Sequence, residues 1–350
     1  MGPRPEKPYN GGMSATTVVF PFALPPAPMA PDLIRALQTS GTPALSALLS
    51  RYVAQHYLPD AADHRVLPHE ALVARALGLS TQDAPVAAAV MAGFGKRPDA
   101  GHWFIVHPIN VQVGTHLQMT DPRATRLDEE ESRILFDSVL SLFREDGHEL
   151  VYGDARTWFM RADAWAGLAT ASPDAASGDN LHPWMPTGDT ARAFRRLQNE
   201  VQMLWFSHPL NEARAARGLA PINSFWLWGG AGAAQQPQGA LATADVPDWL
   251  AMLAAPERRA MTPAQLRAGE VTVVGHALPA GLTEDWSQWL AAMARLEADW
   301  FAPLLAAVRA GTLGELTLVL TNREGWLETR TSKMAQYRFW RGHSLKALQA

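Results

Sequence analysis

Short, nearly all-apolar runs that alternate with helical segments constrain this fold more than any other feature of the sequence. Residues 271–274 (VTVV) and 316–320 (LTLVL) have apolar or β-branched side chains at every position. Strands of this kind are typical of parallel sheets that are buried on both faces. Residues 31–57, 190–206 and 285–309 instead carry apolar side chains at helical spacing. The alternation predicts an α/β core with a mostly parallel sheet flanked by helices.

The middle of the chain has a different pattern. Residues 103–106 read as a strand, residues 128–143 form an amphipathic helix with an acidic first turn, and residues 149–160 suggest a hairpin around Gly153. This order predicts an inserted α+β domain. The predicted organisation is a disordered leader at 1–14, a discontinuous core at 15–94 and 186–345, and an inserted domain at 95–185.

The charge balance and the lack of cysteine exclude several classes of function. The chain has 30 Lys and Arg residues, 34 Asp and Glu residues and a net charge of −4, which gives no field to attract a nucleic acid or an anionic membrane. Without cysteine, disulfides, thiolate metal sites and cysteine nucleophiles are excluded. No apolar run reaches the roughly 20 residues of a membrane span. We therefore expect a cytoplasmic protein with no membrane partner.

The most distinctive motif begins at His208. The segment 207–214 reads SHPLNEAR, and residues 221–230 read PINSFWLWGG. Asn211 and Arg214 are three positions apart, so in a helical turn they share a face. A guanidinium beside an amide suits a carboxylate or a phosphate. The alternative is that Arg214 forms a structural ion pair with Glu212 or another neighbour.

This motif resembles the archaeal-type cofactor-independent phosphoglycerate mutases, which carry H-P-x-N-x-x-R-x-x-x-G followed by I-W-L-W-G. The overall layout and the Trp-rich C terminus also resemble the bacterial RpfE-type regulatory proteins. The resemblance implies an alkaline-phosphatase-like core with an inserted domain. It further implies two divalent metals at the carboxyl ends of the core strands, held by Asp and His, and a serine that is phosphorylated.

The sequence departs from this family where the family binds metal. Where the first core strand of the family ends in Asp-Gly, residues 20–24 read FPFAL, and Leu320 is followed by TNRE rather than by Asp-His. The metal-binding H-x-x-x-x-D-E-x-x-H stretch has no counterpart between Ala277 and Asp285. These departures predict degenerate metal sites. They favour a protein without metal or cofactor, whose catalytic residues, if it has any, are unknown from the sequence, and enzymatic activity stays open.

The leading hypothesis is therefore a catalytically degenerate, regulatory or small-anion-binding protein. A phosphorylated or carboxylate ligand would be held by polar side chains of the motif and its neighbourhood, namely His182, His208, Asn211, Arg214 and Asn223.

Two alternatives remain. The first is an active phosphoglycerate mutase or phosphotransferase whose metals are held by shifted ligands, with Asp63, His64, His107, Asp121 and His182 as candidates. The second is an adaptor that docks a protein partner through its basic and aromatic C-terminal tail, residues 326–350.

The dipeptide His69-Glu70 is interpreted as the start of a helix rather than as an acid–base pair.

Overall fold

The structure, a computed structural model, describes residues 15–60, 64–178 and 180–349. The expected leader at 1–14 and the candidate ligand Asp63 lie outside the described residues. The chain divides into two units. Unit 1 comprises the chain up to Asp60, Ala240–Val246 and the chain from Glu257 onward, and unit 2 comprises Ala61–Gly239 and Pro247–Pro256.

The apolar runs form the six-stranded sheet of unit 1, in the order β2-β12-β11-β1-β10-β9. Strands β9, β10, β1 and β11 run parallel, whereas β12 is antiparallel to both β11 and β2. This mixed, mostly parallel sheet confirms the predicted α/β fold class. Its strands are β1 (Ala15–Phe20), β2 (Ala54–Pro59), β9 (Leu241–Ala244), β10 (Val271–Val274), β11 (Glu315–Thr321) and β12 (Gly325–Ser332).

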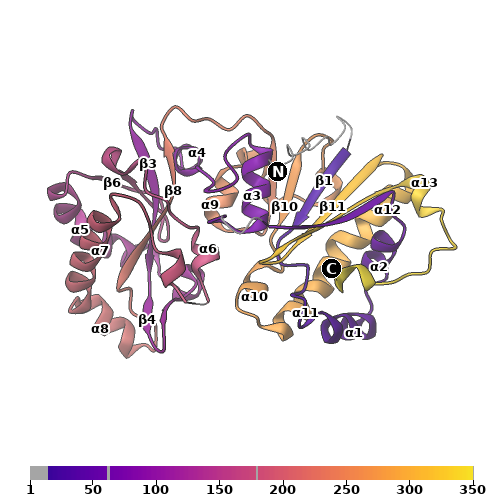
Figure 1. Cartoon of the computed structure of the whole chain (residues 1–350), viewed down its shortest axis with the longest axis horizontal. Helices are drawn as coiled ribbons and strands as arrows, with labels where there is room; N and C mark the ends of the chain where they lie inside the picture. Colours follow the sequence, from indigo (N-terminus) through magenta and orange to yellow (C-terminus); the bar gives the residue numbers. More distant parts are fainter. Residues whose placement is uncertain (1–14, 61–63, 179, 350) are drawn as a thin grey trace, which may run out of the picture. The chain divides into compact units, whose positions relative to one another are not determined.

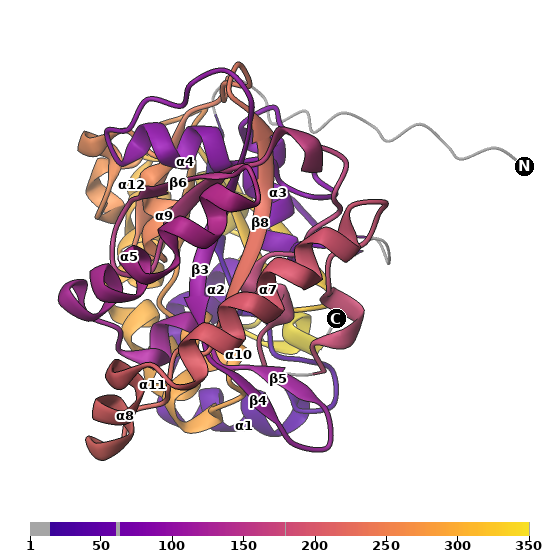
Figure 2. The ribbon, with the colours of Figure 1, turned by 90° about the vertical axis from the view of Figure 1, so that its left-hand side faces the viewer.

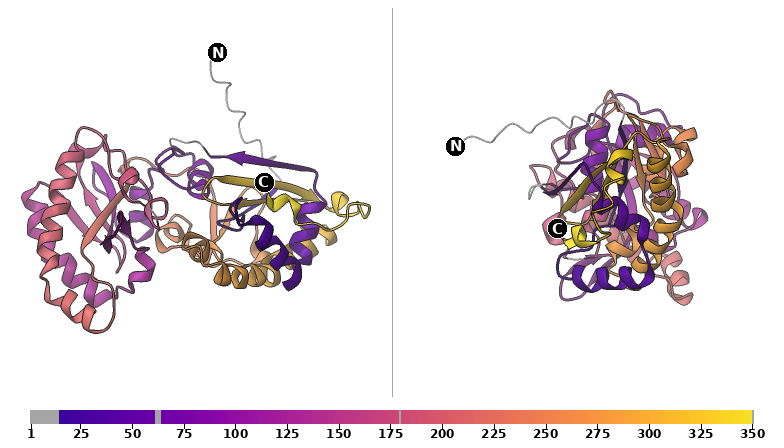
Figure 3. Two further views of the ribbon diagram at one scale, coloured as in Figure 1. Left: turned by 60° about the horizontal axis from the view of Figure 1, so that its bottom comes forward. Right: turned by 90° about the vertical axis from the view of Figure 1, so that its right-hand side faces the viewer.

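Helices gather on one face of this sheet (Figures 1 and 3). Alternate residues of the central strands, such as Val18, Phe20 and Leu318, pack with apolar helical side chains such as Leu37 and Trp289. The helices are α1 (Ala30–Ser40), α2 (Pro43–Ser50), α10 (Leu278–Leu282), α11 (Trp286–Leu296), α12 (Ala302–Ala310) and the short α13 (Lys333–Gln336), with a π-helical turn at Glu297–Phe301 between α11 and α12.

The predicted helix at 31–57 is wrong as a single element. Gly41 ends α1 with a φ of +83°, a conformation that favours glycine, and Pro43 starts α2. The remaining residues form β2, which pairs with β12 at the edge of the sheet. The apolar spacing continues through the break, so periodicity alone did not reveal the two boundaries.

Unit 2 is built on the antiparallel sheet β6-β7-β3-β8, with a separate two-stranded β4-β5 ladder. Its strands are β3 (His102–Ile109), β4 (Val111–Val113), β5 (Leu117–Met119), β6 (Glu149–Tyr152), β7 (Trp158–Arg161) and β8 (Ser224–Gly232). The predicted hairpin is confirmed by the β6–β7 pairing of Tyr152 with Trp158. The helix predicted at 128–143 is also confirmed, because Asp128 caps α5 by accepting a hydrogen bond from the Glu131 amide.

Helices cover the four-stranded sheet of unit 2. Helices α5 and α7 lie in front of β3 and β8 in Figure 2, and their apolar side chains share a core with Phe104, Phe225 and Leu227. Helix α4 also packs on β3 and β8. The helices are α3 (Pro68–Ala76), α4 (Ala87–Gly93), α5 (Glu129–Glu145), α6 (Pro173–Ala176), α7 (Ala191–Phe206), α8 (Pro209–Ala216) and α9 (Asp248–Met252).

Strand β8 marks the main difference from the predicted organisation. Its residues fall within the predicted core at 186–345, yet the strand pairs antiparallel with β3 of unit 2. Residues 224–229 are all buried, since α7 and α4 both contact this strand. A strand buried on both faces is apolar throughout in either kind of sheet. The observed division accordingly assigns 61–94 and 186–239 to unit 2, where the predicted limits had placed them in the core.

Within the described residues, the helices are too short or too polar to cross a lipid bilayer.

Candidate functional site

The carboxyl ends of the parallel strands in unit 1 are the first place to look for a site, because open α/β sheets bind their ligands there. Strand β1 ends at Phe20, and Phe22 follows with a φ of 57° and only 5% of its surface exposed. A β-carbon on Gly281 would lie 2.4 Å from the Phe22 β-carbon, and the Trp289 indole donates a 2.7 Å hydrogen bond to the Phe22 carbonyl. Packed side chains therefore occupy the space at the carboxyl end of β1.

The neighbouring strand ends carry few polar side chains. After β11, the Asn322 side-chain oxygen accepts hydrogen bonds from the amides of Glu324 and Gly325, at 2.8 and 2.9 Å, and so shapes the turn into β12. After β9 and β10, Asp245 and His276 approach to 3.5 Å. Among the described residues, this edge of unit 1 holds no cluster of three metal-ligating side chains.

Arg214 is a structural residue of unit 2 rather than part of an anion site. Its side chain is fully buried and pairs with Glu131 of α5. Its Nε donates to the Ala220 carbonyl at 2.9 Å, and a terminal nitrogen donates to the Thr125 carbonyl at 2.5 Å. Arg214 therefore forms a structural ion pair, which was the alternative considered from the sequence. Its partner is Glu131 and not Glu212. A dissolved anion has no access to this guanidinium.

The two candidate asparagines bind backbone groups. The Asn211 amide nitrogen donates to the carbonyls of Trp205 and Ile222, and its oxygen accepts from the Ile222 amide, each at 2.8 Å. Asn223 exchanges two 2.8 Å hydrogen bonds with the backbone of Val111. The Asn211 contacts tie α8 to the end of α7 and to the segment before β8, and the Asn223 contacts tie that segment to β4. The motif at 207–230 thus holds the local fold together.

The two candidate histidines do not complete an anion site either. His208 caps α8, where its Nδ1 accepts a 3.2 Å hydrogen bond from the Leu210 amide. His182 is exposed and begins a short 3₁₀ turn, His182–Trp184. The expected anion site therefore lacks its main hydrogen-bond donors, because the side chains of Asn211, Arg214 and Asn223 already donate to groups of the protein.

Two of the shifted metal ligands proposed from the sequence, His107 and Asp121, also have structural roles. His107 is buried and lies 2.6 Å from the Arg156 carbonyl through Nδ1, while its Nε2 accepts a 2.9 Å hydrogen bond from the Trp228 indole. This pattern requires the neutral ring with its proton on Nδ1. Burial lowers the pKa of His107 to about 4. Asp121 caps the turn at Pro122–Thr125 and pairs with Arg123.

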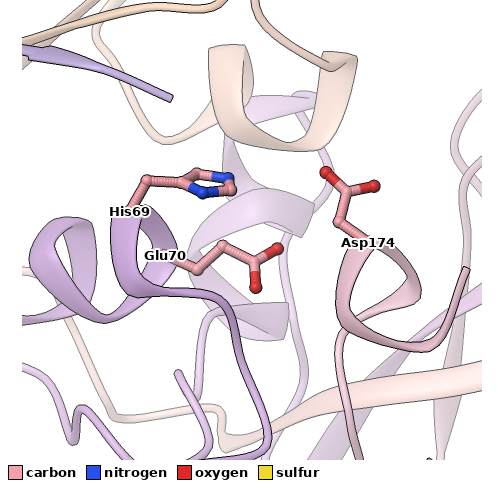
Figure 4. A group of neighbouring side chains, drawn as sticks. All are labelled: His69, Glu70 and Asp174. Atoms are coloured by element: carbon pink, nitrogen blue, oxygen red, sulfur yellow. The ribbon is translucent and has the colours of Figure 1, made fainter. Parts of the chain in front are cut away.

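A different cluster was missed by the sequence analysis. His69 and Glu70 stand in the first turn of α3, and Asp174 stands in α6. All three are buried, and one potential ligand atom from each lies within 4.8 Å of the others. In Figure 4 the His69 ring and the Glu70 side chain extend from α3 toward Asp174. No other group of this kind occurs in the part of the chain that the structure describes.

Hydrogen bonds fix the two carboxylates of this cluster. One Glu70 oxygen, Oε2, accepts 2.6 Å hydrogen bonds from the Leu67 amide and the Ser172 hydroxyl. Arg123 donates to Asp174 at 2.8 Å. Burial, followed by the charge of Asp174, raises the pKa of Glu70 to about 8, against the opposing effects of the Ser172 and Leu67 hydrogen bonds and of Arg123.

The sequence indicated only two of the three residues of this cluster. His69 and Glu70 are adjacent and were considered together, but Asp174 lies about one hundred residues later in a Ser- and Pro-containing segment that reads as a connection. Nothing in the spacing links the two segments.

A pocket of about 430 Å³ lies in unit 1 near the C terminus. Arg341 and Lys346 contribute positive charge, Ser50 and Gln55 contribute polar groups, and none of the lining residues is acidic. The Arg341 guanidinium stacks 4.4 Å from the Tyr52 ring centroid and donates to the Tyr52 carbonyl at 3.3 Å. Two cationic side chains and polar groups in one pocket suit a small anion.

Known proteins resemble parts of the chain in sequence and nearly all of it in fold. No family model matches. A 2,3-bisphosphoglycerate-independent phosphoglycerate mutase of Methanothrix thermoacetophila is 32% identical over 66 residues, which are 19% of this chain and 17% of that protein. Another mutase of the same description, from Methanosarcina mazei, is 24% identical over 122 residues, or 34% of this chain and 31% of that protein.

The solved structure of the PH0037 protein from Pyrococcus horikoshii has a similar fold, with a TM-score of 0.55 at 12% identity over 96% of this chain and 92% of that one. This likeness concerns the fold alone. The sequence matches establish a phosphoglycerate-mutase-like relationship for part of the chain, and they span less than a third of the length of either mutase.

Proposed function

We propose that this chain is a catalytically inactive, phosphoglycerate-mutase-like protein that binds a small phosphorylated or carboxylate anion in a regulatory role. The observation that carries the proposal is the strand end at Phe22. Metal-dependent phosphoryl transfer needs hard or borderline ligands such as Asp and His around the phosphoryl oxygens. At this end of β1, however, a buried aromatic ring packs against Gly281.

The pocket at Arg341 and Lys346 supports the anion-binding part of the proposal. Two cationic side chains and the hydroxyl of Ser50 line one cavity without a carboxylate. A guanidinium that is held in place by an aromatic ring suits a planar carboxylate or a phosphate. This pocket takes the place of the site expected around Arg214, whose side chain is closed to solvent.

The proposal includes two finer assignments made from the sequence. The protein functions like the bacterial RpfE-type regulatory proteins, and it is located in the cytoplasm. Cell fractionation would test the location independently of the binding experiments.

A coupled phosphoglycerate mutase assay with added Mn²⁺, run beside a metal-dependent mutase, tests the catalytic part. We expect no turnover from the folded protein. Turnover would contradict the proposal and would favour the alternative of an active mutase with relocated metal ligands.

Calorimetric titration with 3-phosphoglycerate, inorganic phosphate and citrate tests the binding part. We expect the double variant Arg341→Ala/Lys346→Ala to lose at least about tenfold in affinity for the anion that binds, because each charge-assisted contact contributes about 1.5 kcal/mol or more. Arg295→Ala, an exposed arginine of α11 outside the pocket, is the matched control and should bind as the wild type does. Equal affinities in all three proteins would refute the pocket assignment.

A second candidate function, docking of a protein partner, is favoured by the exposed aromatic side chains of the tail. Phe339 and Trp340 are 81% and 69% exposed, and Arg338 and Arg341 lie beside them in the sequence. Exposed aromatic and arginine side chains are typical of interface anchors. The variant Phe339→Ser/Trp340→Ser should remain as stable as the wild type and lose capture of the partner. If the folded variant still captures that partner, the tail is not the docking site.

A further inference from the structure

We propose that His69, Glu70 and Asp174 form a binding site for one divalent metal ion of the borderline class, such as Zn²⁺ or Mn²⁺. The cluster lies within unit 2 and shares no residue with the strand end and the pocket of unit 1 on which the proposed function rests. The inference therefore goes beyond that function and does not depend on it.

The donor set fits such an ion. One imidazole nitrogen and two carboxylate groups are ligands that Zn²⁺ and Mn²⁺ accept. An ion with bonds of about 2.1 Å spans at most about 4.2 Å between two ligand atoms. The ligand atoms here lie within 4.8 Å of one another, so side-chain shifts of about half an ångström would close the site.

The buried carboxyl groups of the cluster outnumber the cationic group beside them. Glu70, Asp174 and Asp121 place three carboxylates around a single guanidinium, that of Arg123. Buried carboxylates are costly unless they are paired or coordinate a metal. A divalent ion bound among the ligands would offset the charge of those carboxyl groups that are ionised.

Glu70 provides a second, independent observation. Its side chain is 1% exposed, and its Oε1 atom has no hydrogen-bond partner among the described residues, whereas Oε2 has two. Buried polar atoms are almost always satisfied. Glu70 Oε1 is thus a buried carboxylate oxygen without a hydrogen-bond partner inside a His/Glu/Asp cluster, as a metal ligand would be.

The surroundings hold the ligands in position. The Ser172 hydroxyl and the Leu67 amide orient Glu70, and Arg123 orients Asp174. Outer contacts of this kind are typical of protein metal sites, where they fix the ligand geometry. An ion bound here would join the first turn of α3 to α6.

Metal binding is measured on the full-length protein after treatment with chelator and dialysis, by calorimetric titration with ZnCl₂ and with MnCl₂. We expect one ion per chain. Glu70→Gln and Asp174→Asn, which keep the side-chain shapes, should each weaken binding at least about tenfold. The control is Asp245→Asn, which removes a carboxylate beside His276 in unit 1 and should bind metal as the wild type does.

Absence of binding by the wild type, or unchanged affinity in Glu70→Gln and Asp174→Asn, would overturn the proposal. A second measurement uses the wild type alone, so it holds even if the variants fail to fold. Crystals soaked in Zn²⁺ should show an anomalous-scattering peak between His69, Glu70 and Asp174. A peak only elsewhere would overturn the assignment. Mutase turnover or anion binding has no bearing on either readout, so failure of this inference is distinguishable from failure of the proposed function.

Discussion

Arg214 of α8 and Glu131 of α5, 83 residues apart in the chain, form a buried ion pair in unit 2. The pair uses the arginine that most suggested anion binding in the sequence. Glu131 also pairs with Arg217, which is half exposed. Two arginines of the motif thus secure α8 against α5.

Replacement of Arg214 by Ala should destabilise the protein by about 3–5 kcal/mol, because Glu131 would lose its buried partner. The carbonyls of Thr125 and Ala220 would also lose a donor. Urea denaturation measures the change in the free energy of unfolding. Arg35→Ala is the matched control, since Arg35 pairs with Asp32 on an exposed face and should cost less than about 1 kcal/mol. Similar losses in both variants would contradict the structural role of Arg214.

Asn211→Ala should destabilise the protein by on the order of 3 kcal/mol, because three backbone groups of Trp205 and Ile222 would lose their partner in a buried position. Asn223→Ala is a useful comparison. Asn223 is only half-buried, so water can replace its bonds to Val111 and the loss should be smaller. Thermal denaturation of both variants checks the order, and a larger loss for Asn223→Ala would speak against this account.

Stability should fall in mild acid because of His107. Its pKa is about 4 in the folded protein against 6.5 for the free side chain, so between these values the unfolded chain takes up a proton that the folded protein does not. The free energy of unfolding therefore declines as the pH drops from about 6.5 to 4, by roughly 3 kcal/mol in total, and this contribution levels off below pH 4.

Urea denaturation at a series of pH values from 7 to 4 measures this slope. His107→Gln keeps an amide that can donate to Arg156 and accept from Trp228, and it cannot be protonated in this range. The variant should therefore lose part of the acid sensitivity. An identical slope in both proteins would show that other groups cause it.

Gly281→Ala should destabilise unit 1 by about 1–3 kcal/mol, because the added methyl group would lie 2.4 Å from the Phe22 β-carbon. Phe22→Gly removes that atom and suits the positive φ at this position. In a double-mutant cycle, the Gly281→Ala penalty should shrink in the Phe22→Gly background. Additive effects would rule out a direct contact as the cause.

Local structure was largely predictable from the sequence. The strand at 271–274, the hairpin of β6 and β7 and the acidic start of α5 depend on periodicity and capping within a few residues. The single helix at 31–57 was wrong, since its break depends on one glycine and one proline inside a continuous apolar pattern. The candidate site was less predictable. His69 and Glu70 were noted only as a helix start, and Asp174 was not considered.

The sequence by itself determined which segments are strands and helices and that a mostly parallel sheet forms, because hydrophobic period and capping act over short distances. Only the tertiary structure decided that β8 pairs with β3, that Arg214 meets Glu131, and that Asp174 comes to His69 and Glu70. These contacts join residues far apart in the chain. Their partners are selected by packing and by the need to pair buried charges, which no local pattern records.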